Sequence, residues 1–114
     1  RDVLKQAIGN AADTTDIPVK QIIEIAAATE DLGLPADAWW KKAETESIDA
    51  DSRRDEPDEG FGIYISGLNL MVREFVRRNK IDDALALVDK MHPEKLSANR
   101  AMSMEFIVAN LSRP

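Results

Sequence analysis

Cysteine is absent from the 114-residue chain, and histidine occurs once, as His92. Without cysteine the chain cannot form a disulfide, a thiol nucleophile or a thiolate site for zinc or an iron–sulfur cluster. One histidine cannot complete a two-histidine metal motif or a Cys-His catalytic pair. We therefore expect neither a metal nor a cofactor, and the position of His92 at the end of a predicted helix indicates a structural role.

Long apolar runs are also absent. No stretch approaches the ~20 apolar residues that a membrane helix needs, so we expect a soluble protein with no membrane partner. The chain opens at Arg1 and not at methionine, which is compatible with a targeting segment that has been removed. We expect an intracellular location, in the cytoplasm or in the interior of an organelle.

Basic residues are outnumbered. Fifteen of them against twenty-one acidic residues give a net charge of −6, which argues against nucleic acid as a partner for the whole chain. The charge is unevenly divided, because residues 1–60 hold seven basic and fifteen acidic side chains, net −8, whereas residues 61–114 hold eight and six, net +2. The second half has a basic cluster at Arg73, Arg77, Arg78 and Lys80.

Alternating strand patterns are missing, and apolar residues recur at helical spacing nearly everywhere. The spacing predicts an all-α fold with about six helices, over residues 2–12, 18–32, 35 to about 44, 61–79, 81–91 and 98–111. The stop signals include Gly33 and Asn79. Short connections between the last three helices favour antiparallel hairpins, in a short stack like that of a helical-repeat protein or in a bundle.

The organisation that we expect is one compact domain in three parts. Residues 1–50 form an acidic segment of three helices, residues 51–60 form an acidic loop, and residues 61–114 form a helical hairpin and a C-terminal helix. Carboxylates crowd residues 51–59 together with two arginines and Pro57, which is typical of a solvated, mobile loop. Trp39 and Trp40 share a helical stripe with Ala36 and Ala43, and we expect both to pack in the core.

Enzyme motifs are incomplete in this chain. Gly60 and Gly62 resemble the start of a phosphate-binding loop, but Ile65 stands where the third glycine would fall. A calcium loop starting at Asp49 fails because Arg53 and Arg54 occupy a ligand position and the required glycine. We therefore expect no enzymatic activity.

A helix-turn-helix pattern over residues 22–42 is loose, and the acidic surroundings lack attraction for phosphate. DNA is therefore disfavoured as a partner.

The C-terminal half contains the run Leu68-Asn69-Leu70-Met71-Val72, followed by a predicted helix with an Ala-Leu pair and a closing methionine. This pattern resembles a pentatricopeptide repeat. The related tetratricopeptide pattern also fits, on the packing positions Leu68, Met71, Phe75, Ile81, Ala84 and Val88. The resemblance covers about residues 64–107.

A shift of 35 residues carries Met71 and Val72 onto Phe106 and Ile107, as a second repeat would require. The same shift carries Asn69 onto Met104. The second unit is therefore degenerate, or it is a capping helix.

Membership of this family implies a right-handed stack whose first helices line a concave binding surface. In pentatricopeptide proteins the positions matching Asn69 and Asn99 contact a base, and in tetratricopeptide proteins those matching Asn69 and Arg73 grip a peptide. The spacing of Asn69, Arg73 and Arg77 places them on one flank of the helix over 61–79. The partner-binding residues that we expect are Asn69, Arg73, Arg77, Arg78, Lys80 and Asn99.

The function that we expect is a non-catalytic protein–protein interaction module, with the partner gripped by the polar face of the helix over 61–79. One alternative is single-stranded RNA binding by a pentatricopeptide-like unit of a longer array. Another is a small acidic inhibitor or immunity-type protein whose carboxylate loop occupies a basic cleft of its partner. A protein is thus the expected partner, with RNA as the alternative.

Overall fold

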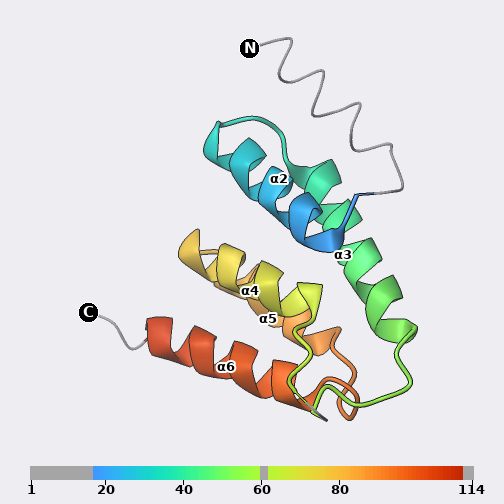
Figure 1. Ribbon diagram of the computed structural model, residues 1–114. Coiled ribbons are helices and arrows are strands. Elements are labelled where there is room, and N and C mark those ends of the chain that lie inside the picture. Colours follow the sequence, from blue (N-terminus) through green and yellow to red (C-terminus); the bar gives the residue numbers. More distant parts are fainter. Residues whose placement is uncertain (1–16, 60–61, 112–114) are drawn as a thin grey trace.

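The computed structural model describes residues 17–59 and 62–111, and these residues form five α-helices (Figure 1). The helices are α2 (Val19–Asp31), α3 (Asp37–Ser52), α4 (Gly67–Arg77), α5 (Ile81–Asp89) and α6 (Ser97–Leu111). Within the described ranges no residue belongs to a strand, although Glu59 and Ile63 form an isolated bridge. The predicted all-α class is confirmed, and the helix predicted over residues 2–12 lies outside the described residues.

The helices are arranged in two layers. Figure 1 shows α2, α4 and α6 side by side, with α3 and α5 behind them. Helices α2 and α3 pair with each other, as do α4 and α5, and α4 packs against all four other helices. The central position of α4 means that most of its surface is covered. Among the described helices none combines the length and the apolar character needed to cross a membrane.

The first helix of each hairpin ends in the same turn. At the end of α2, Gly33 has a φ of 74°, and the N–H of Leu34 donates to the carbonyl of Thr29 at 3.1 Å. At the end of α4, Asn79 has a φ of 61°, and the N–H of Lys80 donates to the carbonyl of Phe75 at 2.8 Å. Glycine and asparagine tolerate this left-handed conformation best. The residue type at each of the two positions therefore explains why the helix ends there, as predicted.

The predicted bounds of three helices need correction. The helix expected to start at residue 61 begins at Gly67, because the Ser66 side chain caps it by accepting from the N–H of Leu68 at 3.1 Å. Tyr64 and Ile65 therefore precede this helix. Helix α3 continues to Ser52, into the segment expected to be a loop, and α5 ends at residue 89 instead of residue 91.

One continuous core lies between the two layers, and α2, α3, α4, α5 and α6 all contribute to it. Trp39 and Trp40 are 2% and 7% exposed, which confirms that both pack in the core. The Trp40 ring meets Phe75 edge to face, with 4.7 Å between the ring centroids. This contact joins the first hairpin to the second.

Gly67 marks the closest approach of α4 to the first hairpin. A Cβ atom added at Gly67 would lie 2.7 Å from Cγ1 of Val19 and 3.0 Å from Cβ of Ser47, and it would collide with the Ser47 hydroxyl. Real Cβ atoms avoid such distances. The absence of a side chain therefore lets the start of α4 rest on both α2 and α3.

We expect Gly67→Ala to lower the free energy of unfolding by about 1–3 kcal/mol, because overpacking outweighs the better helix propensity of alanine. Urea denaturation followed by circular dichroism measures this change. Gly62→Ala is the matched control, because no atom lies within 4 Å of a Cβ added at Gly62. Equal stabilities of the two variants would contradict the close approach.

Candidate functional site

Asn99, one of the predicted partner-binding residues, lies at the centre of a buried polar network. Its side-chain Nδ2 donates to Oδ2 of Asp58 and to the carbonyl of Tyr64, both at 2.8 Å. Its Oδ1 accepts from the N–H of Ser66 at 2.8 Å and from Nδ2 of Asn69 at 3.1 Å. The amide group is thus fully used, and it joins α6 to α4 and to the segment that precedes α4.

The carboxylate of Asp58 is the charged member of this network, although residues 51–59 were expected to be solvated. Asp58 is only 1% exposed, and its Oδ2 also accepts from the backbone N–H of Asn99 at 2.8 Å. Burial raises the pKa of Asp58, but the hydrogen bonds from Asn99 outweigh burial and hold the pKa below its ordinary value. The expectation of a solvated loop is therefore wrong at this residue, because its charge is compensated inside the protein.

Asp51 fastens the other side of the same segment. Its Oδ1 accepts from the Tyr64 hydroxyl at 2.7 Å, and its Oδ2 accepts from the Ser66 hydroxyl at 2.6 Å. Burial and the hydrogen bond to the carboxylate raise the pKa of Tyr64. The Arg54 guanidinium lies 3.9 Å from the centroid of the Tyr64 ring. The end of α3 is thus tied to the residues that cap α4.

Asn69 and Asn99 meet in this structure, but neither is on an open surface. Both side chains are fully buried. Their N–H groups, which would have to donate to a base or a peptide, already donate to acceptors inside the protein. The expectation that they face a concave surface is corrected here. The physical reason is that α6 and the segment around Asp58 cover the flank of α4 on which Asn69 lies.

Arg78 and Lys80 are held in a cluster of ion pairs between the two hairpins. Arg78 contacts Glu74 at 3.0 Å, Asp31 at 2.9 Å and Glu30 at 3.2 Å, and its side chain is 15% exposed. Lys80 contacts Glu30 at 2.7 Å. Burial raises the pKa of Glu30, but hydrogen bonds from Lys80 and Trp40 outweigh it and lower the pKa. Both basic residues thus tie the turn between α4 and α5 to the end of α2.

Arg73 and Arg77 are the two predicted residues that remain near the surface of α4. The Arg77 side chain is 65% exposed and pairs with Glu74 at 3.0 Å. The Arg73 guanidinium lies 5.4 Å from the centroid of the Phe106 ring on α6. The structure therefore does not bring all six predicted residues to one face.

His92 has a structural contact. Its Nδ1 accepts from the backbone N–H of Glu94 at 3.1 Å and of Lys95 at 3.0 Å, which closes the turn between α5 and α6. Across the part of the chain that the structure describes, no group of three or more acidic or histidine side chains is placed to hold a metal ion.

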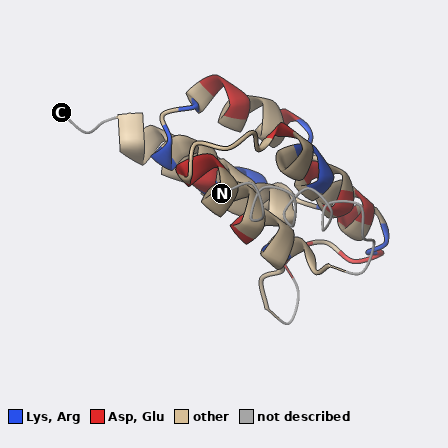
Figure 2. Ribbon diagram, turned by 90° about the horizontal axis from the view of Figure 1, so that it is seen from above, with Lys and Arg blue, Asp and Glu red and all other residues tan. Residues whose placement is uncertain are grey.

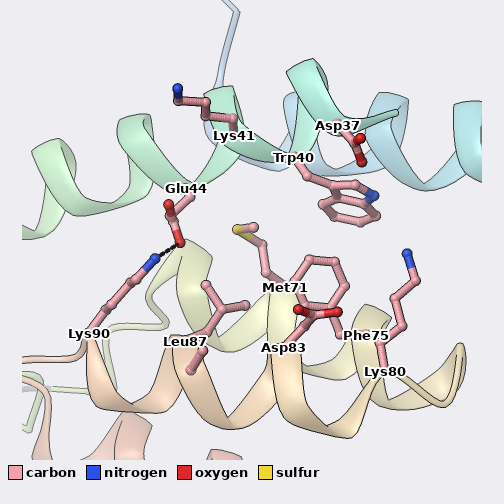
Figure 3. Close-up of a pocket in the computed structure, with 11 residues that line it drawn as sticks. Asp37, Trp40, Lys41, Glu44, Met71, Phe75, Lys80, Asp83, Leu87 and Lys90 are labelled. Atoms are coloured by element: carbon pink, nitrogen blue, oxygen red, sulfur yellow. Dashed lines mark hydrogen bonds and ion pairs between the residues drawn. The ribbon is translucent and has the colours of Figure 1, made fainter. Parts of the chain in front are cut away.

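A groove of about 260 Å³ lies between α3 and α5, with α4 as its floor (Figure 3). Trp40, Met71 and Phe75 form its apolar base and are each at most 8% exposed. Figure 3 shows Glu44 on α3 paired with Lys90, which directly follows α5, across one end of the groove. The groove therefore offers little apolar surface, and an ion pair bridges its walls.

The outer side of α5 and α6 has a different character. We call Leu85, Ala101, Met104, Val108 and Leu111 the α5–α6 apolar face. Leu85, Ala101 and Met104 line a hollow of about 530 Å³ between the two helices, together with Val88, Asp89 and Arg100. The other two residues of the face, Val108 and Leu111, continue along α6. Four of these side chains are between 37% and 62% exposed. In Figure 2 the end of α6 beside the C-terminus is tan, the colour of uncharged residues.

Sequence reasoning missed this face, although α6 carries a signal for it. Ser103 and Ile107 are buried, whereas Met104 and Val108, each one position further along α6, are 39% and 53% exposed on the adjoining flank. Large apolar residues beyond the buried face give α6 more apolar surface than a single core contact requires. That pattern could have indicated a second contact surface.

Comparisons with known proteins identify no relative. No family model matches the chain, and neither the curated proteins nor the solved structures include a match.

We expect Asp58→Asn to lower the free energy of unfolding at pH 7 by about 1–2 kcal/mol, because charge-assisted hydrogen bonds become neutral ones. The folded pKa of Asp58 is lowered, so its stabilisation is present above the unfolded pKa of about 4 and is lost as the pH falls through the folded pKa. The difference between wild type and variant should therefore shrink from pH 7 to pH 3. Urea titrations at both pH values test this, and a constant difference would refute it.

Proposed function

We propose that this chain is a non-catalytic protein–protein interaction module whose contact surface is the α5–α6 apolar face. One observation carries the proposal: eight large apolar side chains of the described residues are exposed, and four of them lie on this face. Those four are Leu85, Met104, Val108 and Leu111. Contiguous exposed apolar surface is typical of binding sites in proteins that fold as single domains.

The polar side of α4 is a weaker candidate for the contact surface. Asn69 and Asn99 are buried, and Arg78 and Lys80 tie the turn after α4 to α2 through ion pairs. A partner that used these groups would first have to break the internal contacts. The same burial disfavours an RNA base at Asn69 and Asn99, and the internal role of Asp58 and Asp51 weakens the acidic-inhibitor alternative.

The two end helices of the front layer differ in a way that supports the proposal. The outward residues of α2 include Lys20 and Glu24, which are exposed. Those of α6 include Met104 and Val108. In helical-repeat stacks a polar outer helix closes one end, whereas an apolar outer helix is an end on which another element packs. We infer that α6 is such an end in a short repeat-like stack.

A photo-crosslinking residue tests this surface. When the photo-crosslinking residue replaces Met104, we expect one discrete adduct with a protein in an extract of the source cells. Placed at Glu24, on the exposed side of α2, it should give none. An excess of unlabelled wild-type protein should suppress the adduct, whereas an excess of Val108→Glu should not, because a carboxylate cannot enter an apolar contact without a large desolvation cost.

Two results would contradict the proposal. One is the absence of an adduct from position 104, and the other is equal labelling from positions 104 and 24. Circular dichroism of Val108→Glu serves as the folding control, and the 53% exposure of Val108 predicts an unchanged melting temperature.

A further inference from the structure

We propose that the α5–α6 apolar face binds the same face of a second copy of this chain, in a two-fold symmetric dimer whose α6 helices run antiparallel. The inference rests on the proposed function and names its partner. The observation behind it is the order of the residues along α6, because their spacing reads the same in both directions.

The outward residues Ala101, Met104, Val108 and Leu111 are separated by steps of three, four and three residues. A two-fold axis perpendicular to α6 at the level of Phe106 maps this stripe onto itself. Ala101 then lies opposite Leu111 of the second copy, and Met104 lies opposite Val108 of the second copy. An isologous interface requires this property, in which each contact occurs twice.

The sizes of the paired side chains are complementary. The small Ala101 faces the large Leu111, and the flexible Met104 faces the branched Val108. Antiparallel helices with such pairs can approach to about 8–10 Å between their axes. Leu85 on α5 flanks the hollow that also contains Ala101 and Met104, so it widens the contact on one side of α6.

The distribution of charge also favours contact between copies at this face. Residues 1–60 carry a net charge of −8, so two copies meeting through that half would repel each other. Residues 61–114 carry +2, and α6 contains only two charged residues, Arg100 and Glu105. Neither of them belongs to the apolar stripe, and Arg100 lines the hollow beside it.

Glu105 lies beside the stripe, one residue from the level of the two-fold axis. The symmetry places it next to Glu105 of the second copy, with an offset of about 3 Å along the helix. Two carboxylates on neighbouring helices at nearly the same level repel each other, and this repulsion opposes association. Glu105→Gln should therefore tighten the dimer about twofold to fivefold, which is the size of an exposed charge pair.

Sedimentation velocity of the purified chain measures the association. One helix pair is a small interface, so we expect a dissociation constant on the order of 10–100 µM. The mass should rise from 12.7 kDa towards twice that value with concentration. Val108→Glu should raise the dissociation constant about tenfold or more. Ile48→Glu is the matched control, because Ile48 on α3 is 41% exposed and lies outside the face, and it should dimerise like wild type.

Single cysteines test the orientation, and the absence of native cysteine makes the result unambiguous. In the antiparallel dimer Ala101→Cys and Leu111→Cys are adjacent across the interface. Two copies of either one are about 15 Å apart along the helix. Mild oxidation should therefore link the mixture of the two variants and not either variant alone. Equal linking of all three samples, or none in the mixture, would overturn the geometry.

The outcomes separate this inference from the proposed function. A chain that stays monomeric at 500 µM, but whose crosslinker at position 104 gives an adduct with a different protein, overturns the dimer and supports the interaction module. Both proposals fail if the chain stays monomeric and position 104 gives no adduct. An adduct of twice the chain mass, lost in Val108→Glu, supports both.

Discussion

The side-chain amide of Asn99 is the constraint on which the arrangement of the second half depends. It compensates the buried carboxylate of Asp58, takes the N–H of Ser66 at the cap of α4, and bonds Asn69 within α4. A buried charge is tolerated only where such partners are present, because desolvation would otherwise favour the unfolded chain. One residue of α6 thereby holds the capping residue of α4 and the segment before it in place, together with Asp51 on the other side.

This internal use of polar groups decides where a partner can bind. The polar flank of α4 is occupied by the Asn99 network at its start and by the ion pairs of Arg78 and Lys80 at its end. Helix α4 also packs against the other four described helices, so little of it is left for a ligand. Contact surface remains on the outer helices, and on α6 it includes the exposed apolar residues Met104, Val108 and Leu111.

Sequence reasoning succeeded where the determining chemistry is local. Gly33 and Asn79 end helices because they accept a left-handed backbone, and Trp39 and Trp40 lie on one helical stripe. It failed where a distant residue decides the outcome. Asp58 belongs to a segment that composition marks as solvated, and the side chain that hydrogen-bonds its carboxylate is Asn99, 41 positions away. The family resemblance associated the position of Asn69 with that of Asn99, but burial turned a proposed binding pair into an internal one.

The position of α6 at the end of the stack explains why its exposed apolar residues need a partner. A stack of two helical layers can cover an inner helix such as α4 on several sides, whereas an end helix such as α6 packs against fewer of the described helices. The end helix must then be polar outside, as α2 is at Lys20 and Glu24, or find another surface to cover it. Met104 and Val108 place α6 in the second class. The spacing of the stripe on α6 is the same in both directions along the helix. The same stripe on a second copy, running antiparallel, therefore matches it residue by residue.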